Sequence, residues 1–124
     1  MRLKNDFYCI TSSNETAGGM EYVIRLNPSH IIYQAHFPGN PITPGVCIIE
    51  IIKELSEDCL KCALFLQKVA KVKFLRVIDP VNNETIHVSM NIADADENGY
   101  KVTASVFNIE CVFTQLSLML ERVS

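Results

Sequence analysis

The amino-acid sequence predicts an α+β domain in which a curved antiparallel sheet of about six strands wraps around one long central helix. The 124 residues contain a single long helical pattern, at residues 46–67, and segments typical of strands lie on both sides of it. The first turns of this helix are apolar nearly all round, so they need cover on every side. A curved sheet supplies most of that cover, and a second copy of the chain would supply the rest. We expect residues 1–124 to form one domain.

Two strands and a long loop precede the helix. The expected strands are residues 6–13 and 20–26, joined by the turn-forming residues 14–19. Residues 28–45 are rich in proline and glycine and predict a loop, with a single helical turn near His30. The helix is expected to begin just after Pro44 and Gly45, two residues suited to a helix start.

Four strands are expected after the helix. Their ranges are residues 68–78, 84–95, 99–109 and 110–123. The pair Asn98-Gly99 is a strong signal for a hairpin turn between the second and third of these strands. His87 alternates with its strand neighbours, so we interpret it as structural.

Composition excludes several classes of protein. The net charge is −3 at pH 7, so the whole chain does not have the positive charge of a nucleic-acid-binding protein. No stretch approaches the roughly 20 apolar residues of a membrane span. The first residues lack the apolar core of a signal peptide. We therefore expect a cytoplasmic protein without a membrane span.

The cysteines indicate reduced thiols. The chain has five, an odd number, and no secretion signal is expected. Cys59 and Cys62 form a CxxC motif, but a zinc site would need a second such pair, and a redox motif would need to open a helix after a strand. Cys47 is expected to pack in the core. We expect no cofactor and no metal.

The segment HFPGNPITPGVCIIE, residues 36–50, holds the residues with the most specific chemistry. His36 precedes three prolines and two glycines, which stiffen a loop and permit tight turns. Glu50 lies in an apolar run, where a charge is costly unless it is paired or neutralised. The same surroundings raise the pKa of a carboxyl group and let it keep a proton, so Glu50 is a candidate general acid.

This segment resembles the signature of the FabZ-type 3-hydroxyacyl-acyl-carrier-protein dehydratases, which have the hot-dog fold. The family pattern is a histidine, then F-P-G-x-P-x-x-P-G, then an acidic residue on the central helix. Here Glu50 follows His36 by 14 residues and Gly45 follows it by nine, which are the family spacings. The expected order of elements fits a hot-dog fold along the whole chain.

The resemblance implies dehydration of a 3-hydroxyacyl thioester to the trans-2-enoyl thioester. Removing a proton from C2 requires a base, and the imidazole of His36 suits this role near neutral pH. Hydroxide leaves C3 poorly unless it is protonated, which assigns the acid to Glu50. Free N–H groups at the helix start, around Gly45 and Val46, would hold the thioester carbonyl. The resemblance adds Phe37 to the substrate-binding residues.

The resemblance also implies partners. In the family the histidine and the acid of one site come from different subunits of a dimer, so we expect a homodimer. Three such dimers could form a hexamer. The acyl group would arrive on an acyl carrier protein. A run of basic residues without an acidic one could receive this acidic carrier: Lys61, Lys68, Lys71, Lys73 and Arg76. We assign Lys68, Lys71, Lys73 and Arg76 to carrier binding, and the alternative is a solvated strand face that protects a sheet edge.

Three departures from the family pattern bear on the substrate. Ala35 replaces the glycine that usually precedes the histidine, and Glu54 replaces a frequent glutamine four residues after the acid. A second carboxylate one turn from Glu50 would raise its pKa further or change what reaches the pocket. The family's N-terminal helix is also missing from the sequence, which begins almost directly at a strand. Both a fatty-acid pathway and a specialised polyene or polyketide-like pathway therefore remain open.

Two alternative functions also stay open. One is a different hot-dog enzyme, either a thioesterase or an enoyl-CoA hydratase. A thioesterase uses a carboxylate and water and has no need of the histidine. The other is a non-catalytic partner subunit of a dehydratase, and the presence of both His36 and Glu50 argues against it.

Overall fold

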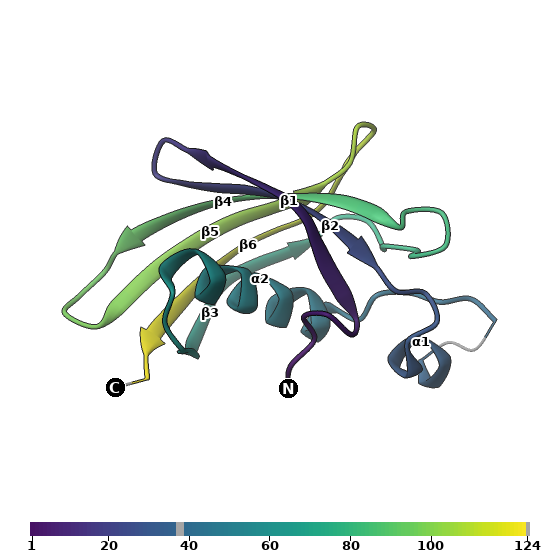
Figure 1. Ribbon diagram of the computed structural model, residues 1–124, viewed down its shortest axis with the longest axis horizontal. Coiled ribbons are helices and arrows are strands. Elements are labelled where there is room, and N and C mark those ends of the chain that lie inside the picture. Colours follow the sequence, from purple (N-terminus) through teal and green to yellow (C-terminus); the bar gives the residue numbers. More distant parts are fainter. Residues whose placement is uncertain (37–38, 124) are drawn as a thin grey trace.

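The computed structural model describes residues 1–36 and 39–123, in which one antiparallel sheet carries a helix along one face (Figure 1). The strands are β1 (Tyr8–Thr16), β2 (Gly19–Leu26), β3 (Leu64–Phe74), β4 (Thr85–Asp94), β5 (Gly99–Phe107) and β6 (Val112–Arg122). The helices are α1 (Ile31–Ala35) and α2 (Gly45–Leu60). The order across the sheet is β1-β2-β4-β5-β6-β3, so β1 and β3 are its edges. The prediction of about six antiparallel strands is confirmed.

The turns lie where the sequence placed them, although the first is tighter. β1 and β2 continue to Thr16 and Gly19, so only Ala17 and Gly18 remain between them, instead of the expected residues 14–19. Gly18 has a φ of +84°, a left-handed conformation that favours glycine. The short helix α1 confirms the expected helical turn near His30, whose Nδ1 accepts a hydrogen bond of 3.0 Å from the N–H of Ile32.

The predicted end of the main helix is wrong. The pattern predicted a helix over residues 46–67, but α2 ends at Leu60 and β3 begins at Leu64. Lys61 adopts a left-handed conformation with a φ of +58°, and its N–H donates to the carbonyl of Glu57 at 2.8 Å. The apolar residues after Lys61 thus satisfy their backbone groups by pairing with β6 rather than by extending the helix.

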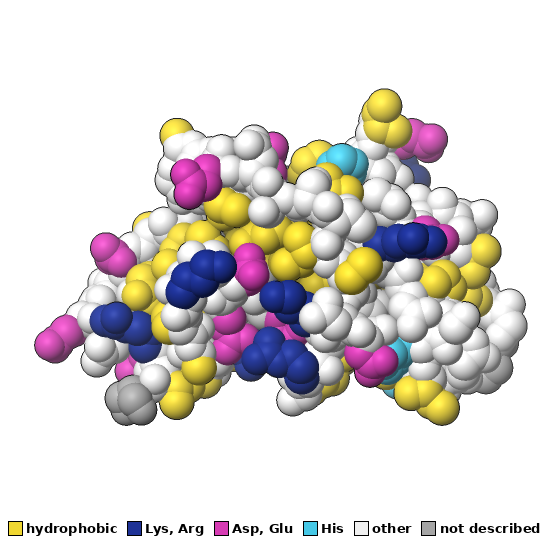
Figure 2. Space-filling model, viewed as in Figure 1, with side chains coloured by type: hydrophobic (Ala, Val, Ile, Leu, Met, Phe, Trp, Pro, Cys, Tyr) yellow, Lys and Arg dark blue, Asp and Glu magenta, His cyan; other side chains and the backbone are white. Residues whose placement is uncertain are grey.

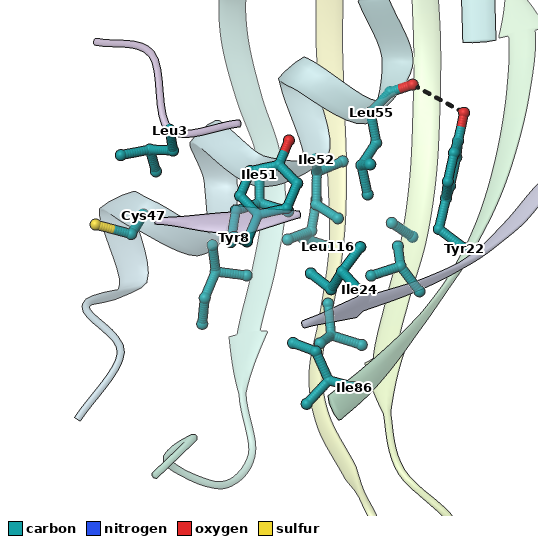
Figure 3. Close-up of a cluster of buried hydrophobic side chains, with 14 of the residues drawn as sticks. Leu3, Tyr8, Tyr22, Ile24, Cys47, Ile51, Ile52, Leu55, Ile86 and Leu116 are labelled. Atoms are coloured by element: carbon teal, nitrogen blue, oxygen red, sulfur yellow. Dashed lines mark hydrogen bonds between the residues drawn. The ribbon is translucent and has the colours of Figure 1, made fainter. Parts of the chain in front are cut away.

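The core lies between α2 and the sheet (Figure 3). Ile52 and Leu55 of α2 are fully buried and face apolar side chains of the sheet, such as Ile24 and Ile86. A hydrogen bond of 3.3 Å from the hydroxyl of Tyr22 to the carbonyl of Leu55 ties the helix to β2. The sheet therefore covers one side of α2.

The N-terminal segment, residues 1–7, adds cover that the sequence did not predict. It runs past α2 before entering β1 (Figure 1), and Leu3 and Phe7 are buried in the same core. β3, by contrast, leaves large apolar side chains exposed at the sheet edge, including Phe65, Leu66 and Phe74. In residues 1–36 and 39–123, no helix is long and apolar enough to span a membrane.

Candidate functional site

His36 lies at the end of α1, on the surface. Its N–H donates to the carbonyl of Ile32 at 3.0 Å, which closes the helix, and its side chain is exposed. The ring is thus available to another molecule. Phe37, which the resemblance assigned to the substrate, lies outside the described residues.

Gly45 opens α2 beside an apolar groove. Pro44 precedes the helix without a side-chain cap, so the first N–H groups of α2 have no capping side chain. A Cβ at Gly45 would lie 2.6 Å from Cζ of Phe74, so a larger residue would push against that ring. The groove has a volume of about 370 Å³, and Gly45, Ile48, Phe74 and Arg76 are among its lining residues. Val46, next in the helix, is 63% exposed. N–H groups and an apolar groove thus occur together at the start of α2.

Glu50 is a half-buried carboxyl group whose Oε2 forms an ion pair with Lys53 but accepts no hydrogen bond from the described residues. Its Oε2 is buried and has no hydrogen-bond partner in the described part of the chain. Nζ of Lys53 is 3.7 Å from that oxygen, which is beyond hydrogen-bond distance. Burial raises the pKa of Glu50 to about 7, and a hydrogen bond shared with Glu54 adds to the rise, while the charge of Lys53 opposes it. A carboxyl group with a pKa near 7 can hold a transferable proton at neutral pH.

Glu54 lies one turn further along α2 and is only 1% exposed. Its Oε2 accepts from the N–H of Leu3 at 2.8 Å, and its Oε1 accepts from the N–H of Lys4 at 2.7 Å and from the hydroxyl of Tyr8 at 3.1 Å. Burial alone would raise the pKa of Glu54, but these bonds and the one from Glu50 lower it below its usual value. We expected a second carboxylate to raise the pKa of Glu50, and Glu54 acts on it in that direction. The partners that keep Glu54 charged are 46 to 51 residues away in sequence, and no sequence signal indicated them.

A single chain does not bring His36 and Glu50 together. α1 lies beyond the N-terminal end of α2 (Figure 1), whereas Glu50 lies further along α2. No hydrogen bond or ion pair joins the two side chains within residues 1–36 and 39–123. Glu50 and the start of α2 lie on one helix of the chain, whereas His36 lies at the surface.

The basic residues divide into two groups. Lys68, Lys71 and Lys73 pair with Met119, Ser117 and Gln115 of β6, whose side chains alternate with buried leucines and so lie on the face opposite α2. Lys71 and Lys73 line a polar groove of about 290 Å³ on that face. Arg76 instead lines the apolar groove beside Gly45.

The remaining candidates have structural surroundings. Nε2 of His30 is 3.0 Å from a carboxylate oxygen of Asp6, His87 stacks on Phe107 with ring centroids 5.5 Å apart, and Cys47 is buried. The prediction that Cys47 packs in the core is confirmed. All five cysteines are free, and within the described ranges no group of three or more histidine, cysteine or acidic residues is placed to hold a metal ion.

Comparisons with known proteins point to dehydratases. The model of a family described as ApeI-like, ApeI dehydratase, matches residues 11–115. A 3-hydroxyacyl-acyl-carrier-protein dehydratase FabZ from Levilactobacillus brevis is 31% identical over 70% of this chain and 72% of its own length. The FabZ protein of Oenococcus oeni is 38% identical, but the match covers only 48% of each protein.

Solved structures extend the likeness to the fold. A chain from "The Dehydratase Heterocomplex ApeI:P" of Xenorhabdus doucetiae superposes with a TM-score of 0.71 and 19% identity, over 91% of this chain and 96% of that one. A hypothetical thioesterase from Streptococcus pneumoniae, solved with coenzyme A, gives a TM-score of 0.64 at 9% identity, over 98% and 92% of the two chains. At such identities the likeness concerns the hot-dog fold alone.

Proposed function

Since the chain belongs to the ApeI-like dehydratase family, we propose that it removes water from a 3-hydroxyacyl thioester carried on acyl carrier protein and releases the trans-2-enoyl thioester. The observation that carries this proposal is the buried Oε2 of Glu50, which accepts no hydrogen bond within the described ranges and lies on the helix whose start borders the apolar groove. Carboxyl groups with strongly perturbed pKa values cluster at functional sites, which favours a catalytic use of Glu50.

The proposed reaction uses a base and an acid in turn. His36 takes the proton from C2, and the electron pair moves toward the thioester carbonyl, whose oxygen the N–H groups at Gly45 and Val46 stabilise. The electrons then form the C2–C3 double bond while the hydroxyl on C3 takes the proton of Glu50 and leaves as water. The reaction ends with a protonated His36 and an ionised Glu50, and one proton transfer resets both.

The apolar groove beside Gly45 suits an acyl chain or the arm of a carrier. Its lining is mostly aliphatic and aromatic, and Arg76 is its one charged residue. Arg76 is therefore placed to meet the phosphate of a carrier arm, and we keep Phe37 as a further substrate contact in this proposal. Lys68, Lys71 and Lys73 lie on the opposite face and would act on the carrier only through longer-range attraction.

We propose a homodimer in which His36 of one subunit meets Glu50 of the other. Two observations support it: the two residues are apart in one chain, and β3 with the residues after it exposes a series of large apolar side chains. These are Phe65, Leu66, Val69, Phe74, Leu75 and Val77. An apolar, unpaired sheet edge is a surface that a second chain covers. A second chain in this position would make α2 the central helix of a closed assembly. Residues 1–124 would form one domain of it, and three such dimers would form a hexamer.

Complementation between two inactive variants tests this arrangement. His36→Ala and Glu50→Gln chains are mixed under conditions that exchange subunits. If the sites are shared between subunits, each mixed dimer regains one intact site, and the mixture recovers about a quarter of the wild-type activity. Sites contained within one chain would leave the mixture inactive.

The reaction itself is tested with 3-hydroxyacyl carrier proteins of several chain lengths, by mass spectrometry. Loss of one water from the acyl group supports the proposal. Release of a free thiol would identify a thioesterase, and preference for coenzyme A thioesters in the reverse direction would identify an enoyl-CoA hydratase. The preferred chain length separates fatty-acid biosynthesis from a specialised lipid pathway.

We place the reaction in the cytoplasm, where five free thiols stay reduced.

A partner subunit is the second candidate function. The solved structure from Xenorhabdus doucetiae is named a dehydratase heterocomplex, so a family member need not work as a homodimer. Activity of the purified chain alone would support a homodimer. Activity that appears only after a second hot-dog subunit is added would support a hetero-oligomer.

A further inference from the structure

The N-terminal segment forms a cradle around Glu54. Two consecutive backbone N–H groups, of Leu3 and Lys4, and the hydroxyl of Tyr8 donate to the carboxylate at 2.8, 2.7 and 3.1 Å. Leu3 and Tyr8 are anchored in the core beside Ile51 (Figure 3). Two ion pairs between basic residues of this segment and the last turns of α2 hold it further: Arg2 to Glu57 at 3.5 Å and Lys4 to Asp58 at 3.3 Å. Basic and acidic side chains lie side by side in this region (Figure 2).

The number of donors decides which carboxyl group keeps the proton. An ionised carboxylate has about four acceptor positions and no donor. Three positions of Glu54 are filled by the N–H groups of Leu3 and Lys4 and the hydroxyl of Tyr8, which leaves one position for a proton from Glu50, one turn earlier on α2. Moving the proton to Glu54 would set an O–H against one of these donors and leave Glu50 charged with a buried Oε2 that accepts no hydrogen bond from residues 1–36 and 39–123, which is costly.

We propose that Glu54, held by the cradle of residues 3–8, is a positioning residue: it keeps the shared proton on Glu50 and leaves Oε2 of Glu50 free for the substrate. The proposal rests on the dehydratase function proposed above. Glu54 does not touch the substrate in this scheme and acts through Glu50.

The other charged groups around Glu50 act with or against Glu54. Lys53, on the same helix, and the amino group of Met1, on the N-terminal segment, favour the ionised form of Glu50. The Cys47 thiol and the Tyr8 hydroxyl are neutral, because burial raises the pKa of both above the ordinary values. Among these groups only Glu54 carries a negative charge near neutral pH, so its removal should act on Glu50 in one direction.

The test is Glu54→Gln, followed by the pH dependence of kcat for dehydration. The variant removes the negative charge and turns an amide N–H, a donor, toward Glu50. Both changes favour ionised Glu50, so the alkaline limb of the pH profile should move to lower pH by about one unit. A ¹³C NMR titration of the Glu50 carboxyl group, without substrate, should show the same shift.

Asp58→Asn is the matched control. Asp58 lies on the same helix, accepts from Nζ of Lys4 at 3.3 Å and from the hydroxyl of Tyr22 at 2.9 Å, and has no contact with Glu50. Its substitution loosens the N-terminal segment but should leave the alkaline limb in place. If Glu54→Gln lowers kcat by the same factor at every pH, Glu54 is only structural and the proposal is overturned.

Two further outcomes are distinguishable. If Glu54→Gln does not fold, the NMR titration of the wild-type protein decides. The proposal requires that Glu50 titrates near pH 7 and that Glu54 stays ionised below pH 4.5. A higher pKa for Glu54 than for Glu50 overturns it. If the wild-type chain dehydrates no thioester while Glu54→Gln still shifts the titration of Glu50, the dehydratase function fails but the placement of the proton stands.

Discussion

Replacing Glu50 by glutamine separates a catalytic acid from a structural carboxyl group. Glutamine keeps the shape of the side chain, and its amide N–H donates to Glu54 as the protonated Glu50 does. It has no proton to give to a leaving hydroxide. We expect kcat to fall by about 10²–10⁴-fold, the usual contribution of a general acid.

The stability of this variant depends on pH in a defined direction. The folded pKa of Glu50, about 7, lies above its ordinary value of 4.5, so the native state keeps a proton that the unfolded chain releases. Wild-type stability therefore falls between about pH 4.5 and pH 7, and the loss is complete above that range. Glu50→Gln has no such loss.

The magnitude follows from the same shift. A rise of about 2.5 in the pKa of Glu50 corresponds to a loss of at most about 3 kcal/mol in the free energy of unfolding. The Glu50 side chain keeps 13% of its surface exposed, and solvent screening reduces this to about 1–2 kcal/mol. For a chain of this length, the melting temperature at pH 8 should rise by about 3–8 °C, with little change at pH 4.5.

The assay is thermal unfolding of the two proteins at pH 4.5 and pH 8, beside single-turnover dehydration at pH 7. A Glu50→Gln variant that loses several degrees at pH 8 and still dehydrates its substrate would refute the reasoning, because Glu50 would then be a structural residue.

Three further predictions concern the base, the groove and the carrier. His36→Ala should lower kcat by about 10²–10⁴-fold without changing the melting temperature, because the side chain is exposed; near-wild-type turnover would remove it from the mechanism. Gly45→Ala should lower kcat/KM about tenfold, because the added methyl group displaces the Phe74 ring into the groove. Its melting temperature should stay within about 3 °C of wild type. Unchanged kinetics would show that the groove is not used. Replacing Lys71 and Lys73 by glutamate should raise KM for carrier-linked substrate and weaken the salt dependence of KM. The kcat value and the turnover of small thioester mimics should not change. An unchanged KM would assign both lysines to a solvated strand face.

The elements were predictable where a local pattern determines them. Alternation of apolar and polar residues indicated the strands, and Pro44-Gly45 indicated the start of α2. The end of α2 was not predictable in this way, because residues 62–66 have apolar side chains that suit a helix or a strand equally. Their pairing with β6, more than 50 residues away, decides between the two.

The face of the lysines also depends on pairing. In a regular strand Lys68 and Lys71 would point to opposite faces, since side chains alternate. The register of β3 shifts between Val69 and Lys71, and this bulge returns both lysines to the face opposite α2. Bulges leave no clear signal in this sequence, so the basic run could be identified but not placed.

The sequence indicated candidate residues, which stay predictions, but it could not indicate their geometry, because the two halves of the proposed site have opposite needs. An acid that keeps its proton near pH 7 requires a dry surrounding and a fixed neighbour, and Glu50 has both through the core and Glu54. In the proposed dimer the base must reach the substrate of another subunit and therefore requires exposure, which His36 has at the end of α1. One chain of this fold supplies the two environments at different places. Contact between two chains along the apolar edge of β3 is the arrangement that we propose to unite them, and the complementation of inactive variants measures it directly.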